Sequence, residues 1–284
     1  MTDKKIAYLA AVLVGLFAGF IPIGSKLVIA DVSPLVFSFF IHLFQLPFLL
    51  IAMFLTGEKL FLPTSARSKY FFAGIVILGL VGIALVNFGY SGGLALEGAF
   101  LSRLEPLFAG LLGFLLFREG LHRNQWLGML MAFIGLFLFF SSGLMFSVFS
   151  IFFLAAALSW GLQDVLAKEI IHQAGPGLMN LGRVLFGSAV LGFFVFPEIL
   201  PVLTVHWISF LLVGFLYFGT NYLGFYAMKE LTAAEAVSFY LMGPVISLLL
   251  SAVWLHEPIS GAQLAGGAVI LLGLGLVSVY AIKK

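Results

Sequence analysis

The chain has 284 residues, of which 62% are hydrophobic and only 9% are charged, and its mean hydropathy is +1.18. Soluble domains carry about 25% charged residues, so this composition argues against a water-soluble protein. The formal net charge of +2 comes without a basic stripe, which argues against a nucleic-acid-binding protein. The absence of cysteine excludes disulfides, thiolate metal sites and cysteine nucleophiles.

Ten stretches are apolar enough to form transmembrane helices, each of which needs about 20 residues. They cover residues 6–28, 34–56, 70–92, 96–117, 124–142, 148–171, 177–197, 206–228, 233–255 and 261–281. The first stretch follows two lysines in the manner of a signal peptide, but it is longer than a signal core and is interpreted as a retained span. The spans are too long for the strands of a membrane β-barrel. We therefore expect an all-α integral membrane protein with ten transmembrane helices.

The positive charges predict the orientation of these helices. If the chain starts inside, eleven of the fourteen Lys and Arg residues fall in cytoplasmic segments. The opposite orientation would place nearly all of them outside, against the usual cytoplasmic excess of positive charge. Both termini are therefore expected in the cytoplasm, and a prokaryotic inner (plasma) membrane is the expected location.

An internal repeat divides the chain. Adding 138 to the positions of Glu97, Pro106 and Glu119 gives Glu235, Pro244 and Glu257. The early part of each half aligns at an offset of 142 instead, which pairs Gly19 with Gly161, Lys26 with Lys168, and Pro34 with Pro176. Each half contains five expected spans, an odd number, so the second half enters the membrane inverted. Residues 1–143 and 144–284 are thus predicted to form a 5+5 inverted-topology repeat, a transporter architecture with its site near the midplane.

The repeated motifs resemble those of EamA-type proteins of the drug/metabolite transporter superfamily. In that family the first helix of each unit carries Trp-Gly followed by Lys, which Trp160-Gly161 and Lys168 match. The first half has Ala18-Gly19 and Lys26, and so lacks the tryptophan. Three further motifs match. A proline that starts a helix is followed seven residues later by an arginine, as in Pro176 and Arg183. A mid-helix proline precedes a terminal glutamate in Pro106 with Glu119 and Pro244 with Glu257, and paired glycines occur as Gly128 with Gly135 and Gly266 with Gly273. In the first half, Pro34 is followed by Ile41 and His42 where the arginine would stand. The resemblance implies a ten-helix solute carrier and no single substrate.

Arg103 and Glu105 are charged residues inside a predicted span, and such residues are functional candidates because their burial in a membrane is costly. Pro106 removes a backbone donor, so its helix is expected to face protein or water rather than lipid. In the functional interpretation Arg103 binds an anionic group of the solute. Glu105 then binds a solute amine or a coupling proton. The alternative is a static buried ion-pair network.

A second group lies in the other half of the chain. Trp160, Gln163 and Asp164 follow helical spacing and are expected to share one helix face. Asp164 and Arg183 are expected at similar depth, where we favour a structural or gating ion pair over direct solute contact. Asn180 should share the face of Arg183.

The remaining polar candidates are amides, a histidine and tyrosines inside predicted spans. Two interpretations, lining of a cavity or hydrogen bonding between helices, are open for Asn87 with Tyr90 and for Asn221 with Tyr217. For His42, which is spaced to share a helix face with Gln45, proton relay is weighed against packing. Tyr222 is a candidate for an aromatic wall. The complete set of predicted solute-binding residues is Arg103, Glu105, Asn87, Tyr90, His42, Gln45, Trp160, Gln163, Asn221 and Tyr222.

Glu119 and Glu257 end the fourth and ninth predicted helices, as gate or capping residues or as solvated helix ends. The paired glycines favour close helix packing. They also leave open a homodimer through the fifth and tenth helices.

These features favour a secondary transporter that moves a small amphipathic, amino-acid-like metabolite, with export suggested by the family resemblance. A proton is the candidate coupling ion, and neither a cofactor nor a metal is implied. The alternatives are an intramembrane enzyme and a non-transporting receptor or scaffold. The enzyme is disfavoured because no His-Glu-x-x-His or Gly-x-Ser-x-Gly motif occurs and only one aspartate lies in a span.

Overall fold

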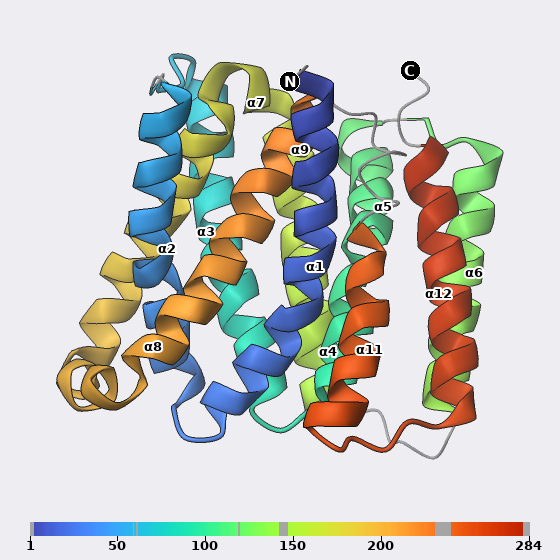
Figure 1. The fold of residues 1–284 in the computed structure, drawn as a ribbon. Helices are drawn as coiled ribbons and strands as arrows, with labels where there is room; N and C mark the ends of the chain where they lie inside the picture. The colour runs from blue at the N-terminus through green and yellow to red at the C-terminus, as the bar shows by residue number, and fades with distance from the viewer. Residues whose placement is uncertain are drawn as a thin grey trace.

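The computed structural model describes residues 3–58, 60, 62–118, 120–141, 147–230 and 240–280. All regular secondary structure in these ranges is helical, and the helices stand side by side in one bundle (Figure 1). The bounds in chain order are α1 Asp3–Ile29, α2 Pro34–Thr56, α3 Ala66–Tyr90, α4 Ala95–Leu101, η1 Ser102–Leu104, α5 Glu105–Phe117, α6 Arg123–Phe140, α7 Val148–Val195, η2 Phe196–Glu198, α8 Ile199–Phe218, η3 Gly219–Leu223, α9 Gly224–Glu230, α11 Met242–Trp254 and α12 Gly261–Tyr280.

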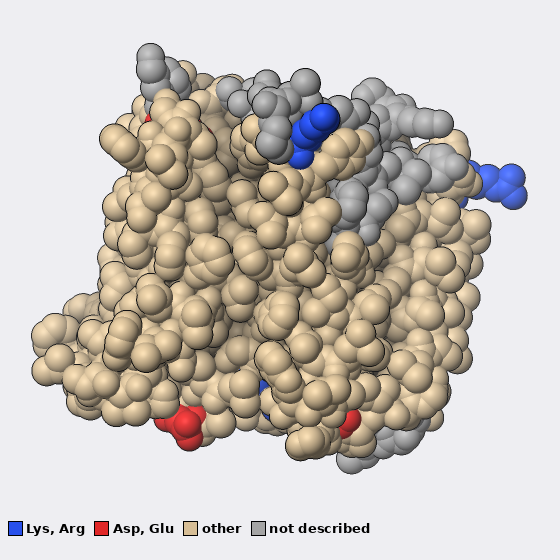
Figure 2. Space-filling view, in the orientation of Figure 1, with Lys and Arg blue, Asp and Glu red and all other residues tan. Residues whose placement is uncertain are grey.

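Within the described residues, seven helices are long and apolar enough to cross a membrane. Two further apolar helices, Met242–Trp254 and Gly261–Leu276, are shorter. Figure 2 shows that described charged side chains on the visible face lie near the two ends of the bundle, with a broad uncharged band between them. These features fit an integral membrane protein whose band faces lipid hydrocarbon.

Capping residues set both ends of α2. Ser33 precedes α2, and its side chain accepts a hydrogen bond from the backbone N–H of Val36. Pro34 occupies the first turn, where its missing N–H would have no helical partner. Gly57 ends α2 with a φ of 62°, a left-handed conformation that costs glycine little.

Helix α7 contains the two spans expected at 148–171 and 177–197. Gly175 has non-helical backbone angles, with φ 70° and ψ 160°, and Pro176 follows it. Figure 1 shows the chain reversing direction in α7 at one end of the bundle. The connection between the two predicted spans is therefore a turn that separates two antiparallel arms of α7.

Two segments depart from the continuous helices that the sequence predicts. The stretch expected as one helix over 96–117 is broken by the 3₁₀ turn η1, directly before Pro106. The stretch expected over 206–228 begins earlier, at Ile199, and changes to π-helix in η3. Proline is tolerated in a first helical turn, so Pro201 does not delay the start of α8.

Helices α6 and α12 pack directly against each other. A Cβ added to Gly266 would lie 2.6 Å from Gly135 O, and one added to Gly273 would lie 2.5 Å from Gly128 O. The paired glycines thus serve backbone contact within one chain. A homodimer through these helices would have to use their other faces.

Candidate functional site

A cavity of about 180 Å³ lies where the broken segment α4–η1–α5 meets α1, α3, α7 and η3. It gathers eight of the residues predicted from the sequence: Tyr90, Arg103, Glu105, Trp160, Gln163, Asp164, Arg183 and Asn221. They come from both halves of the chain. Because its lining combines four charged groups with aromatic rings, the cavity suits a small solute that is both charged and partly apolar.

Arg103 is a cation without a hydrogen-bond or ion-pair partner among the described residues. It lies in η1, lines the cavity and is half-buried. No hydrogen bond or ion pair joins it to any other residue of the described ranges. A guanidinium in such a place offers several N–H donors to an anionic group.

Glu105 and Asp164 bring two carboxyl groups together. Glu105 is the first residue of α5, and Asp164 lies on the first arm of α7. The side chain of Asp164 is within hydrogen-bonding reach of both Glu105 and Gln163. The close approach is possible because Gly161 packs against the backbone of α5, where an added Cβ would lie 2.9 Å from Glu105 O.

Arg183 lies on the second arm of α7 and is only 4% exposed. One terminal nitrogen donates to Asn180 Oδ1 at 3.5 Å, as the shared helix face predicts, while Nε has no partner. Asp164 and Glu105 both act on it electrostatically, yet the described residues include no direct Arg183–Asp164 ion pair. The predicted pair is thus a proximity of charges rather than a salt bridge.

Glycines on α3 make room for the side chains of α7. A Cβ on Gly79 would clash with Arg183 and would lie 2.9 Å from Gln163 Oε1. A Cβ on Gly82 would clash with the indole of Trp160. Trp160 Nε1 and Gln163 Oε1 are both buried without hydrogen-bond partners. The lining therefore has one N–H donor and one oxygen acceptor available for a ligand.

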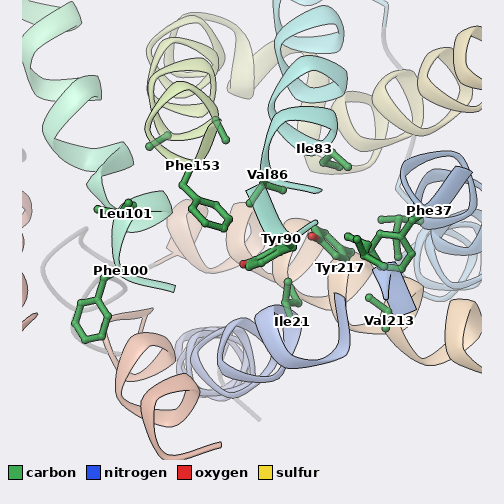
Figure 3. Packing of buried hydrophobic residues seen from close by; sticks show 14 of the residues in the cluster. Ile21, Phe37, Ile83, Val86, Tyr90, Phe100, Leu101, Phe153, Val213 and Tyr217 are labelled. Atoms are coloured by element: carbon green, nitrogen blue, oxygen red, sulfur yellow. The ribbon is translucent and has the colours of Figure 1, made fainter. Parts of the chain in front are cut away.

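Tyrosines form part of the cavity wall. Tyr90 and Tyr217 are adjacent in the packed interior (Figure 3), and both line the cavity. Cavity lining was one of the two interpretations of Tyr217, whereas Tyr240 was not among the predicted residues. The repeat offers a signal for Tyr240, because subtracting 138 gives Ser102, which lines the same cavity.

Three predicted residues form a polar layer behind the cavity. Gln45 Oε1 accepts a hydrogen bond from Asn221 Nδ2 at 3.1 Å, and so supports a residue of the lining. Asn87 Nδ2 donates to Ser38 Oγ at 2.9 Å, and His42 Nδ1 lies 2.8 Å from Ser38 O. The structure therefore places these side chains in contacts between and within helices.

Tyr222 lies in a different place from its neighbour Asn221. Its hydroxyl donates to Glu58 at 3.3 Å and lies 3.3 Å from Thr56. Glu58 also accepts from the backbone N–H of Gly177 at 2.8 Å, at the start of the second arm of α7. Sequence reasoning missed Glu58, which lies just after α2 and outside every predicted span.

Glu257 lies just after α11 and contacts the start of α4. Its carboxylate accepts from the N–H groups of Ala95 at 2.8 Å and Leu96 at 3.1 Å, and so caps α4. Lys26 Nζ lies 3.4 Å from the same carboxylate and donates to Gly93 O. We call these contacts of Lys26, Glu257 and the start of α4 the latch. Glu119, the other predicted gate residue, lies outside the described residues.

No group of three His, Asp or Glu side chains in the described ranges is placed to hold a metal ion.

Comparison with known proteins gives related sequences. The probable amino-acid metabolite efflux pump of Escherichia coli (strain K12) is 26% identical over 70% of this chain and 71% of its own length. The protein of the same name in Salmonella typhimurium (strain LT2) is 28% identical, with coverages of 66% and 68%. The transporter YoaV of Bacillus subtilis (strain 168) is 25% identical, and the match covers 94% of each chain.

The fold is also similar to a solved crystal structure. The TM-score is 0.69, and the match covers 99% of each chain at 17% sequence identity. At this identity the likeness concerns the fold alone.

The EamA-like transporter family matches this chain twice, over residues 5–141 and 148–279. The matches span nearly the whole sequence and confirm the resemblance drawn from the repeated motifs. The chain is an integral membrane protein and belongs to the EamA-like transporter family.

Proposed function

We propose that the protein is a secondary transporter that exports a small amino-acid-like metabolite by alternating access to the cavity. The observation that carries this proposal is Arg103, a cation that faces the cavity with no partner in the described chain. A solute carboxylate would supply the missing anion. Glu105 lies two residues away on the same lining and would receive the solute's amine.

The size of the cavity supports a small solute. Pockets for drug-sized ligands occupy roughly 300–1,000 Å³, whereas this cavity measures about 180 Å³. The Escherichia coli and Salmonella relatives are named as probable amino-acid metabolite efflux pumps. Export of an amino-acid-like compound agrees both with the names of these relatives and with the charged side chains of the lining.

We further propose ten spans arranged as two inverted units, residues 1–143 and 144–284. The composition of the cavity supports this arrangement, because residues at repeat-equivalent positions line it together. These pairs are Ala18 with Trp160, Ile21 with Gln163, Pro22 with Asp164, Ile83 with Asn221, Val86 with Gly224, Ser102 with Tyr240, and Arg103 with Leu241. A site built by both units at their interface is expected for inverted-repeat carriers.

The expected orientation places both termini in the cytoplasm of a prokaryotic cell, with the protein in the inner membrane. In support, α1 begins and α12 ends at the same end of the bundle (Figure 1). The latch lies at the opposite end, which would be the outer one. In this arrangement it acts as an outer gate that must open before the solute leaves.

Transport by purified protein in proteoliposomes tests the proposal. We expect saturable counterflow of at least one compound from a panel of radiolabelled amino acids and their N-acyl or ester derivatives. Arg103→Ala should weaken apparent affinity by about 10- to 100-fold, the effect of losing a charge-assisted hydrogen bond worth about 1.5–3 kcal/mol. Arg67→Ala is the matched control, because Arg67 is a surface residue whose side chain is 69% exposed.

Different results would contradict the proposal. Conductance that does not saturate would indicate a channel, and the absence of flux for every compound would favour a receptor or scaffold. If a folded Arg103→Ala variant bound the solute with the parent's affinity, Arg103 would not be the residue that binds the solute carboxylate.

A further inference from the structure

Glu105 and Asp164 meet across the boundary between the two halves of the chain. Glu105 begins α5 in the first half, and Asp164 lies on the first arm of α7 in the second half. Their carboxyl groups are within hydrogen-bonding reach of each other, and both line the cavity. An ionised carboxylate has only acceptor sites, so two such groups form a hydrogen bond only when one of them carries a proton.

The surroundings of the pair indicate a site that takes up a ligand. Arg183 and Gln163 line the same cavity, are each 4% exposed, and keep one polar atom without a partner. Arg183 is close enough to act electrostatically on both carboxyl groups, yet it forms a salt bridge with neither. The pair has a net charge of −1 when its two carboxyl groups share one proton. The positive charge of Arg183 then neutralises it.

We propose that Glu105 and Asp164 form a shared proton-binding site whose occupancy holds the two halves of the transporter together at the cavity. The site takes one proton from water and releases it to water in each transport cycle. With the proton bound, the two carboxyl groups hydrogen-bond at the close approach that this structure shows, where the latch is closed. Without it, two negative charges face each other in a poorly hydrated place, and their repulsion favours separation of the halves.

The other ionisable groups near the pair define what a pH titration would measure. The groups that face the pair or its cavity are Arg183, Tyr240 and, farther along the lining, Arg103. Arginine and tyrosine do not ordinarily titrate near neutral pH. Histidine ordinarily does, but His42 on α2 is buried and packs on Gly187 rather than lining the cavity.

This inference rests on the proposed function for the meaning of the cavity, but the shared proton can be measured without any solute. Failure to find a transported compound would therefore leave it testable. Conversely, a solute could bind Arg103 even if the carboxyl pair held no proton.

Infrared difference spectroscopy on the purified protein tests proton binding directly. During a titration from acidic to alkaline pH, the parent should lose a buried protonated-carboxyl band in a single transition. Glu105→Gln and Asp164→Asn should each remove that band, because the single remaining carboxylate is then neutralised by arginine. His42→Gln and the exposed control Glu198→Gln should keep it. Persistence of the band in either amide variant, or its loss in His42→Gln, would overturn the proposal.

Thiol labelling tests the link between the proton and the conformation, and the absence of native cysteine makes a single introduced cysteine specific. Ala99→Cys places the thiol on α4, in the lining and close to the latch. In right-side-out vesicles with pH clamped on both sides, external labelling is divided at each pH by the labelling of the same variant in denatured protein, which removes the effect of thiol ionisation. This normalised labelling should rise several-fold on alkalinisation. Adding Glu105→Gln or Asp164→Asn should fix labelling at its low-pH level, and an unchanged pH response would overturn the coupling.

Conservative variants keep the proposal testable if an amide variant fails to fold. Glu105→Asp and Asp164→Glu each retain two carboxyl groups but change their separation. Both should keep the infrared band and shift the pH of its transition. An unchanged transition in both would show that the two groups do not share a proton.

Discussion

Among the described residues, some charged side chains have a hydrogen-bond or ion-pair partner in the protein and others do not. Glu257 is 8% exposed and uses both carboxylate oxygens, for two backbone N–H groups and for Lys26. Arg103, by contrast, faces the cavity and has no hydrogen-bond or ion-pair partner among the described residues. A satisfied buried charge serves structure or gating, whereas an open one is available to a ligand.

Glu257→Ala should destabilise the closed latch. The change leaves two N–H groups of α4 uncapped and Lys26 without its carboxylate. Loss of a helix cap costs about 0.5–2 kcal/mol, and the partly buried ion pair adds to it. A total of about 2 kcal/mol would raise the population of the outward-open state by roughly 30-fold.

External labelling of Ala99→Cys measures that population. The control is Glu198→Ala, since Glu198 is an exposed acidic residue at the start of α8 with no part in the latch. Labelling that matched the parent in Glu257→Ala would show that the latch is not a gate.

At the scale of helices, irregular segments line the cavity, whereas α6 and α12 are regular and pack closely against each other. The 3₁₀ turn η1 and the π-helical segment η3 both contribute to the cavity. Backbone of this kind is tolerated at membrane depth where it lines a water-filled site. The pair α6 and α12 is regular and packs through glycines away from the cavity.

Gly266→Ala should weaken the contact between α6 and α12 without changing solute affinity. The added Cβ would lie 2.6 Å from Gly135 O and 2.7 Å from Phe139 Cα, both backbone atoms that cannot rotate away. Overpacking of this type costs about 1–3 kcal/mol. The measurement is the thermal midpoint of the purified protein, which should fall by several degrees.

Gly261→Ala is the matched control, because a Cβ at Gly261 would meet no atom within 4 Å. Both variants exchange glycine for alanine in the same helix. Equal thermal midpoints for the two would contradict the account of the α6–α12 contact.

For the whole molecule, the sequence predicts helix positions better than it predicts helix rotation. The predicted range 34–56 coincides with α2 because a cap, a proline and a glycine mark its ends. The break at η1 was not predicted, because Pro106 indicates a perturbed helix but not which turn tightens.

The candidate site shows the same limit. Charges inside apolar spans are rare, so Arg103, Glu105, Asp164 and Arg183 could be selected without a structure. Their neighbours could not, because the approach of Glu105 to Asp164 depends on how α5 and α7 are packed. Tyr222 turns toward Glu58 within the π-helical segment, where the wider helical turn changes which side chains share a face.

The central claim is that one cavity between the two halves is reached from one side of the membrane at a time. Ala99→Cys reports the side of the latch, and Val14→Cys, on the half of α1 nearer its start, reports the other. With impermeant thiol reagents on oriented vesicles, any transported solute or pH change that raises labelling at one position should lower it at the other. Simultaneous high labelling of both positions from their own sides, or labelling that never responds, would contradict alternating access.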